Sequence, residues 1–501
     1  MENIYSLAYG FSIFLQPTNL VYCFLGVLMG TLVGVLPGLG PGATLSLLLP
    51  LIFKVSPVSA LIMLCGICYG AAYGGSTTSI LVNIPGEISS IVTCLDGYQM
   101  ARQGRAGPAL GIAAFGSFIA GTVGVVGLMI FAPTLANFAI RFGSPEYFSL
   151  AVMSLTLVSY ISKGSLIHSL LMACLGIIMS TVGMDPFTSR TRFTFGLPYL
   201  LDGFGLVFVA MGIFGLGEVL NNLVQTVQQT ILQGKIKNLL PNRQDWKNSV
   251  KPIARGTIIG FFLGILPGFG TAIPTFISYA LEKKLSRHPE KFGTGVIEGV
   301  AGPESANNAA YSGTFIPMLS LGIPVNVSSA ILLGALMILG LQPGPLLISS
   351  RPDVFWGLIA SMYVGNVMLV VLNLPLIGLW VKVLRVPYSI LCALIVLLCE
   401  IGAYSVNNSV SNVLLMNIFG LVGFLMRRYD FEGATLILAL VLGPMLENSL
   451  RRSLLQSDGS PWIFFSRPLS ALFMLIALIS LISPLFTGER LGKRARETIE
   501  D

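Results

Sequence analysis

Charged residues are scarce in this chain of 501 residues. They make up 10% of it, against 54% hydrophobic residues, whereas a soluble domain carries about 25% charged residues. Apolar runs of about 20 residues recur along the chain instead, each long enough to cross roughly 30 Å of hydrocarbon. No long polar stretch remains for a soluble domain, so energy from ATP would have to come from another chain.

The apolar runs are continuous, as in 107–131, 203–224 and 354–371, and lack the alternation of membrane β-strands. They predict an all-α polytopic membrane protein with about ten to twelve membrane elements. No basic residue precedes Lys54, so the charged start of a removable signal peptide is missing. We therefore expect no removable signal peptide.

Groups that carry enzyme chemistry are also few. The two histidines, His168 and His288, have no spaced acid or cysteine partners, and no HExxH, GxSxG or Walker A motif occurs. Cys65 and Cys68 form a CxxC, but without a second pair or a nearby histidine they are better explained as packing residues than as metal ligands. We expect the chain not to be an enzyme.

The net charge of +7 permits two interpretations. Nucleic-acid binding is one, but the basic residues cluster in short loops between apolar runs, which is typical of the positive-inside rule. The clearest cluster lies in 225–255, where Asp245 is the single acid. We therefore expect 226–255 to be a cytoplasmic linker, and we expect no nucleic-acid partner.

The most informative feature of the sequence is an internal duplication. The motif GTLVGVLPGLG, which starts at Gly30, returns as GFFLGILPGFG from Gly260. Downstream, AAYGG returns as AAYSG, and Ile84-Pro85 returns as Ile323-Pro324. Several matches in the same order are hard to produce by chance. We predict a first repeat at 1–225, a second repeat at 256–486 and a cytoplasmic tail at 487–501.

Loop charge indicates that the two repeats are inverted. The stretch 256–282 lies between two basic loops and is too short for two full spans. We expect a helical hairpin there that enters from the cytoplasm, turns at the glycines and leaves on the same side. The matching segment, 20–53, is flanked only by Lys54, which favours the opposite face. We therefore predict two inverted repeats, each with a re-entrant helical hairpin and a broken helix.

Each hairpin turns at a Pro-Gly motif, PGLGPG from Pro37 and PGFG from Pro267. Proline ends a helix and glycine permits positive φ, so a second half-helix begins just after each motif. Its first amides have no intrahelical partner, and its dipole makes the end an anion site without basic side chains. Packing is the alternative explanation for such glycines. We assign packing to Gly30, Gly34, Gly260 and Gly264.

A second repeated stretch is polar in an apolar setting. It reads YGGSTTS from Tyr73 and continues to Asn83, and its partner reads NNAAYSGT from Asn307 and continues to Asn326. Hydroxyls and amides can donate to a carboxylate, and freed carbonyl or Asn oxygens can ligate Na⁺. For any single hydroxyl, a hydrogen bond to its own helix is the alternative.

Glu304 stands just before this partner stretch. An acid at membrane depth is costly and marks function by default, so Glu304 is a candidate for carrying a proton or holding Na⁺. A position in the membrane interface, near 283–291, is the alternative. Glu87, Asp96 and Glu298 are weaker candidates because they lie nearer polar loops.

These motifs resemble the large membrane subunit of the tripartite tricarboxylate transporter family. The resemblance rests on GxLPGLGPG, GxLPGFGTAIP, AAYGGSTTSILVNIPGE and EGVAGPESANNAAYSGTFIPMLSLGIP, and it covers residues 15–440. It implies a bacterial inner-membrane permease that works with a small four-helix membrane subunit and a periplasmic solute-binding protein. It also implies an ion gradient as the driving force and carboxylates as substrates, without naming one.

We therefore predict secondary-active uptake of a small carboxylate, coupled to Na⁺ or H⁺. A passive anion channel and a non-transporting membrane scaffold are the alternatives, and an elevator motion is favoured over rocking of two halves. The residues expected to bind substrate are Gly38, Gly40, Gly42, Thr44, Ser76, Thr77, Thr78, Asn83, Pro85, Gly268, Gly270, Thr271, Asn308, Tyr311, Ser312 and Thr314. Those expected to serve ion coupling are Glu304, Asn307 and Asn326. We expect no cofactor and no metal beyond Na⁺.

Overall fold

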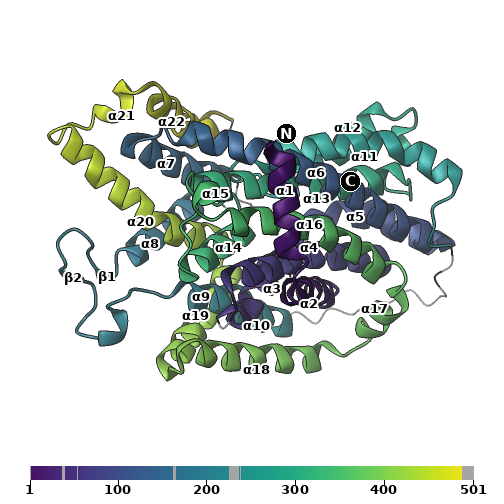
Figure 1. Cartoon of the computed structure of the whole chain (residues 1–501). Coiled ribbons are helices and arrows are strands. Elements are labelled where there is room, and N and C mark those ends of the chain that lie inside the picture. Colours follow the sequence, from purple (N-terminus) through teal and green to yellow (C-terminus); the bar gives the residue numbers. More distant parts are fainter. Residues whose placement is uncertain are drawn as a thin grey trace.

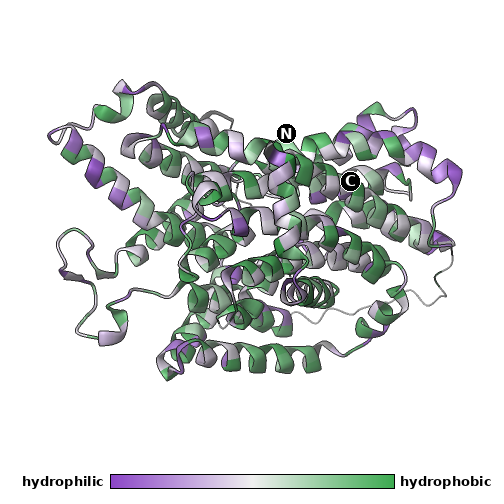
Figure 2. Cartoon of the chain, viewed as in Figure 1, coloured by the Kyte–Doolittle hydropathy of each residue, from purple (hydrophilic) through white to green (hydrophobic). Residues whose placement is uncertain are grey.

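The computed structural model describes residues 2–36, 40–53, 55–161, 165–224, 236 and 238–487, and most of these are helical (Figure 1). Eight helices of this described part are long and apolar enough to cross a membrane. Hydrophobic residues dominate the helices, and hydrophilic ones gather mainly in α11, α12 and α20 and near helix ends (Figure 2). The prediction of an all-α polytopic membrane protein is confirmed.

The elements follow one another along the chain in two halves, and the duplicated segments have the same order in each. The first half contains α1 (Glu2–Phe14), α2 (Pro17–Gly34), α3 (Pro41–Leu48), η1 (Leu49–Ile52), α4 (Pro57–Val82), η2 (Ile88–Ser90), α5 (Ile91–Thr93), η3 (Cys94–Tyr98), η4 (Ala101–Arg105), α6 (Ala106–Ala139), α7 (Ser144–Ile161), α8 (Leu166–Ser180), β1 (Gly183–Met184), β2 (Thr191–Arg192), η5 (Pro198–Leu200), α9 (Leu206–Ala210), η6 (Met211–Leu216) and α10 (Gly217–Val224). The second half contains α11 (Arg243–Gly264), α12 (Ala272–Leu285), η7 (Pro289–Lys291), α13 (Glu298–Leu321), α14 (Val327–Ile338), α15 (Leu347–Ser350), α16 (Pro352–Asn373), α17 (Ile377–Val383), α18 (Tyr388–Asn407), α19 (Val410–Arg428), α20 (Gly433–Gln456), α21 (Ile463–Ser466) and α22 (Pro468–Thr487). By the duplicated motifs, α2, α3 and α4 correspond to α11, α12 and α13, and η2 with α5 corresponds to the start of α14.

A helix ends shortly before each Pro-Gly motif, and the next helix begins at Pro41 in the first half and at Ala272 in the second. Residues 35–40, the first interruption, separate α2 from α3, and residues 265–271, the second interruption, separate α11 from α12. Gly268 and Gly270 have φ angles of +85° and +55°, a region that glycine adopts without strain. In the first interruption, residues 37–39, and with them the predicted site residue Gly38, lie outside the described residues. So do 225–235 and 237 of the central segment and 488–501 of the tail.

The helix before each interruption packs closely on the long helix that follows. A Cβ on Gly30 of α2 would lie 2.4 Å from a backbone oxygen of α4, and one on Gly260 of α11 would lie 2.1 Å from a backbone oxygen of α13. Residues without a side chain allow such an approach of two backbones. The packing explanation is confirmed for these glycines and, one turn on, for Gly34 and Gly264.

The two halves also interlock. The short helix α3 of the first half packs against α14 of the second half, while α12 packs against η2 and α5 of the first half. The long helices also pack against the opposite half, since α4 contacts α16 and α13 contacts α6. Equivalent elements therefore make equivalent contacts, and each interruption leads into a helix that meets the opposite half.

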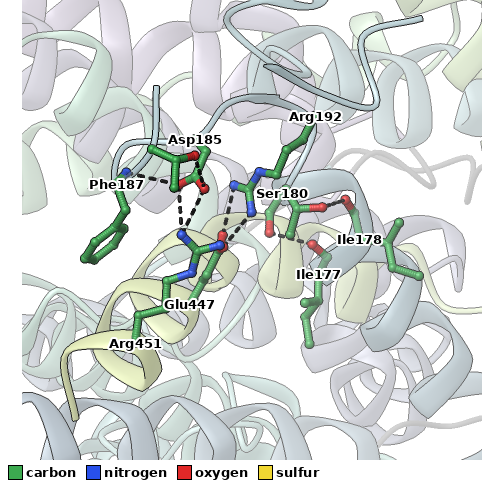
Figure 3. A network of polar contacts seen from close by, with 10 residues as sticks. Ile177, Ile178, Ser180, Asp185, Phe187, Arg192, Glu447 and Arg451 are labelled. Atoms are coloured by element: carbon green, nitrogen blue, oxygen red, sulfur yellow. Dashed lines mark hydrogen bonds and ion pairs between the residues drawn. The ribbon is translucent and has the colours of Figure 1, made fainter. Parts of the chain in front are cut away.

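A β-hairpin, in which β1 and β2 pair antiparallel, projects from the helical body (Figure 1). Its Arg192 donates to Glu447 of α20 through two nitrogens, at 2.6 and 3.2 Å (Figure 3). Arg451 of α20 donates to both oxygens of Asp185, at 2.9 and 3.0 Å. We call Asp185, Arg192, Glu447 and Arg451 the hairpin network.

Candidate functional site

The first interruption leads to a place where the two halves meet. A Cβ built on Gly40 would lie 3.7 Å from Cβ of Glu87, which belongs to the loop after α4. A Cβ on Gly42, in the first turn of α3, would lie 2.9 Å from Cγ1 of Val327, the first residue of α14. The start of α3 therefore lies between a loop of its own half and a helix of the other.

The second interruption lies against the loop that precedes α14. The amide of Gly268 donates to the carbonyl of Val325 at 3.0 Å, and a Cβ on Gly270 would lie 3.6 Å from Cβ of Asn326. The Asn326 side chain accepts a hydrogen bond from the amide of Ser329 at 2.8 Å and so caps α14. Its observed role is that of a helix cap, and its part in ion coupling stays a prediction.

The side chain of Glu87, in the first half, accepts hydrogen bonds from residues of the second half. Its carboxylate oxygens accept hydrogen bonds from Nδ2 of Asn307, at 2.8 Å, and from the hydroxyl of Tyr311, at 3.0 Å, both on α13. Both donor residues are buried, at 1% and 3% exposure. Glu87 is therefore central to the candidate site, although the sequence ranked it as a weaker candidate. Its equivalence to Asn326 in the repeat is the signal that would have identified it.

The side chain of Glu304, in the second half, accepts hydrogen bonds from residues of the first half. Its Oε2 accepts a hydrogen bond from Oγ of Ser76 at 2.6 Å, and its Oε1 accepts one from Oγ1 of Thr93. Glu304 is 1% exposed and lies within the helical body. Glu87 and Glu304, which we call the crossing acids, thus each accept two hydrogen bonds from neutral donors of the opposite half.

The crossing acids have no basic partner in the part of the chain that the structure describes. None of the ion pairs found there includes Glu87 or Glu304. A buried carboxylate that keeps its charge needs a balancing positive charge nearby. These two acids are therefore suited to the reversible binding of a proton or a cation.

Several predicted hydroxyls bond to the backbone of their own helix, which was the alternative explanation for them. Thr44, Thr77 and Thr314 donate to the carbonyls of Gly40, Tyr73 and Tyr311. Thr78 also donates to the carbonyl of Val35 at 2.8 Å, and so satisfies a backbone group where α2 has ended. Thr44 and Thr78 therefore bond to the backbone at the two ends of the first interruption, and a contact with substrate stays a prediction for all four threonines.

The other predicted residues have varied surroundings. Oγ of Ser312 and the hydroxyl of Tyr69 lie 2.9 Å apart, and Nδ2 of Asn308 donates to Oγ of Ser117 at 2.7 Å. Asn83 ends α4 with a φ of +60° and has an exposed side chain. Gly322 ends α13 in the same left-handed conformation, so Asn83 has a backbone role at this position. Pro85 follows it in the loop, and Thr271 lies directly before α12.

Comparison with known proteins identifies the family. The model of the tripartite tricarboxylate transporter TctA family matches residues 20–438. The chain belongs to this family. A relative from Agrobacterium vitis, described as "Uncharacterized 52.8 kDa protein in TAR-I ttuC' 3'region", is 49% identical over 501 residues, which is 100% of both chains. A second, "Uncharacterized protein in TAR-II ttuC' 3'region" from the same organism, is 47% identical over 242 residues, which is 48% of this chain and 100% of that protein. No solved structure matches.

Membership of the TctA family makes this chain the large membrane subunit of a tripartite tricarboxylate transporter, and so a transport protein rather than an enzyme. The resemblance that the motifs predicted is confirmed. The match to the TctA family spans both interruptions, both loops beside them and both crossing acids, so the whole candidate site belongs to the part of the chain that defines the family.

Proposed function

We propose that this chain is the permease of a secondary-active transporter that takes up a small carboxylate, a tricarboxylate or a related organic acid, at the expense of a Na⁺ or H⁺ gradient. It acts with a periplasmic solute-binding protein and a small four-helix membrane subunit in a bacterial inner membrane. Membership of the TctA family supports tricarboxylate transport in general. The geometry of the candidate site supports the binding of a carboxylate and its coupling to an ion.

One observation carries this proposal, namely the position of α3 between Glu87 and Val327. The first amides of α3 have no intrahelical partner and carry the positive end of the helix dipole, which suits an anion. Glu87, one of the crossing acids, lies close by, and it would repel a carboxylate substrate while it is charged. Neutralisation by a proton or a cation removes that repulsion. Substrate binding and ion binding are therefore coupled by charge.

The equivalent contacts of equivalent elements support an inverted repeat with two re-entrant hairpins, α2–α3 and α11–α12. Irregular backbone is tolerated at membrane depth where it is buried in protein or lines a cavity, and both interruptions lie against other segments of the protein. Paired interrupted helices are the usual place for a transporter's midplane site. A unit that carries both hairpins across the membrane, as in an elevator, would keep the site intact during transport.

Uptake into proteoliposomes tests the proposal. The chain is reconstituted with its small subunit and binding protein, and labelled citrate and shorter carboxylates are supplied with a Na⁺ gradient, with a pH gradient or with neither. We expect accumulation above the external concentration for at least one carboxylate under one of the two gradients. Flux without accumulation would identify a passive anion channel, and no flux in the complete system would identify a scaffold. Either outcome would refute the proposed function.

A further inference from the structure

A small cavity lies where α4, α6, α13 and the end of α16 meet. Its polar lining comes from buried residues of all four helices, namely Tyr73, Ser76, Thr77, Ser117, Glu304 and Asn373. It has room for about one particle the size of a water molecule. A bare sodium ion is smaller than a water molecule, so the cavity is large enough for one dehydrated ion.

One amide oxygen of the cavity lining, and a second on a residue bonded to that lining, have no donor among the described residues. Asn373 is 4% exposed, its Nδ2 donates to the carbonyl of Leu369 at 2.9 Å, and its Oδ1 has no partner. Nδ2 of Asn308 donates to Oγ of Ser117 in the cavity wall, and Oδ1 of Asn308 likewise has no partner. Buried polar atoms almost always have a partner. An unpaired amide oxygen in the same wall as a carboxylate suits a group that brings positive charge into the cavity.

The charges around the cavity also favour a positively charged occupant. Glu304 receives its hydrogen bonds from the hydroxyls of Ser76 and Thr93, which leave its negative charge unbalanced. α16 ends at Asn373, so the negative end of its dipole lies at the cavity as well. Among the described residues, no group of three or more His, Cys, Asp or Glu side chains could hold a metal ion. One carboxylate matches a single positive charge better than a double one.

We propose that this cavity binds a dehydrated monovalent cation of the size of Na⁺, held by the Glu304 carboxylate and Oδ1 of Asn373, with the hydroxyls of Ser76, Thr77 and Ser117 within the same wall. Carboxylate, amide and hydroxyl oxygens are the ligands that hard cations prefer. The inference rests on the proposed function, because it assigns the ion that drives uptake. Binding of the ion itself can be measured without transport.

The cation site is connected to the candidate substrate site through one face of α13. Asn307, Asn308 and Tyr311 stand three, four and seven residues after Glu304, so the four residues share a face of α13. Asn307 and Tyr311 hold Glu87 beside the first interruption. A cation on Glu304 therefore reduces the negative charge that an anionic substrate meets, and fixes the helix that positions Glu87.

Thermal unfolding of the purified chain, without substrate or partner subunits, tests the site. NaCl is compared with KCl and choline chloride at constant ionic strength and at several pH values. We expect saturable stabilisation by Na⁺, because a ligand that binds the folded state raises the melting temperature. Glu304→Gln and Asn373→Ala should each weaken the apparent Na⁺ affinity at least roughly tenfold, as expected when one ligand of a buried charge is lost.

Two matched variants serve as controls. Glu400→Gln removes another acid on an apolar helix, one that also accepts from a neutral amide, that of Asn417 at 2.9 Å. Asn412→Ala removes another buried asparagine, one that accepts from Tyr199 at 2.8 Å. Both should keep the Na⁺ affinity of the unmodified chain. If Glu304→Gln does not fold, Asn373→Ala carries the test.

The cation site would be overturned by an absence of stabilisation specific to Na⁺, or by unchanged affinity in Glu304→Gln and Asn373→Ala. Uptake driven by protons, with no Na⁺ stabilisation, would overturn the cation site and leave the proposed function standing. Saturable Na⁺ binding that these variants weaken, in a complete system without uptake, would support the site and refute the proposed function.

Discussion

The crossing acids and the hairpin network hold their carboxylates in opposite ways. Glu87 and Glu304 accept hydrogen bonds from amide and hydroxyl groups that carry no charge. Asp185 and Glu447 instead face the guanidinium groups of Arg451 and Arg192 (Figure 3). Each set has one buried acid (Glu304 or Asp185) and one half-buried acid (Glu87 or Glu447), so burial alone does not distinguish the two sets.

The difference lies in what balances the negative charge. An arginine balances a carboxylate permanently and orients it through two parallel bonds, so the hairpin network is suited to holding the β-hairpin on α20. Neutral donors orient a carboxylate but leave its charge to be balanced by something else. The crossing acids therefore suit a protein that must bind and release an ion, and the hairpin network suits a part that must stay fixed.

The largest effect is expected where a crossing acid is removed. Glu87→Ala leaves Nδ2 of Asn307 and the hydroxyl of Tyr311 without an acceptor in a buried place. Each such loss costs about 1–3 kcal/mol, so we expect uptake to fall roughly 100-fold. The measurement is the initial uptake rate per correctly inserted molecule in the reconstituted three-component system.

Glu447→Ala is the matching variant in the hairpin network. It removes the carboxylate that Arg192 and Arg451 share, and we expect a lower melting temperature with little change in uptake rate. Equal losses of uptake in Glu87→Ala and Glu447→Ala would remove the distinction between the two kinds of acid.

An intermediate effect is expected from filling the contact between α3 and α14. A Cβ on Gly42 would lie 2.9 Å from Cγ1 of Val327, so Gly42→Ala should displace α3 from the other half. Overpacking of this kind costs about 1–3 kcal/mol, which corresponds to roughly a tenfold loss of uptake. Val327→Ala in the same chain makes room for the new methyl group and should restore most of the rate. A double variant as impaired as Gly42→Ala alone would show that this contact does not determine uptake.

The smallest effect is expected on the melting temperature, which should depend on pH through the hairpin network. The amide of Phe187, and after it Arg451, lower the pKa of Asp185 from its usual 3.8 to about 2. Because the pKa in the folded state is the lower one, the carboxylate stabilises the hairpin above pH 4, and this stabilisation is lost as the pH falls to about 2. Asp185→Asn should therefore flatten the fall in melting temperature over this range. An equally steep fall in this variant would assign acid sensitivity to other groups.

The sequence predicted much of the architecture because the features that determine it are local. Proline and glycine in direct succession favour a break in a helix, and small residues four apart permit close packing of two helices. The two interruptions and the packing of Gly30 and Gly260 followed from these rules. The duplication was visible because matching segments keep their order along the chain.

The pairing of the crossing acids could not be predicted in the same way. Ser76 and Glu304 stand 228 positions apart and meet through packing of the two halves. Thr93 and Asn373 belong to none of the repeated motifs, so nothing in the sequence marked them as neighbours of Glu304. Asn83 stood out as a polar residue, whereas its left-handed backbone explains its place equally well. Local patterns identify interrupted helices, and three-dimensional contacts decide what they face.

The central claim is that the interrupted helix of one half meets the other half at the place where the carboxylate binds. In a variant without the native cysteines, Gly42→Cys and Val327→Cys would place two Cβ atoms about as far apart as a disulfide requires, because a Cβ on Gly42 lies 3.6 Å from that of Val327. The measurement is the rate of disulfide formation in native membranes under mild oxidation, with and without the carboxylate that the uptake assay identifies. The account predicts ready formation that saturating carboxylate slows. A pair that does not cross-link, or one that cross-links at the same rate with and without the carboxylate, would contradict it.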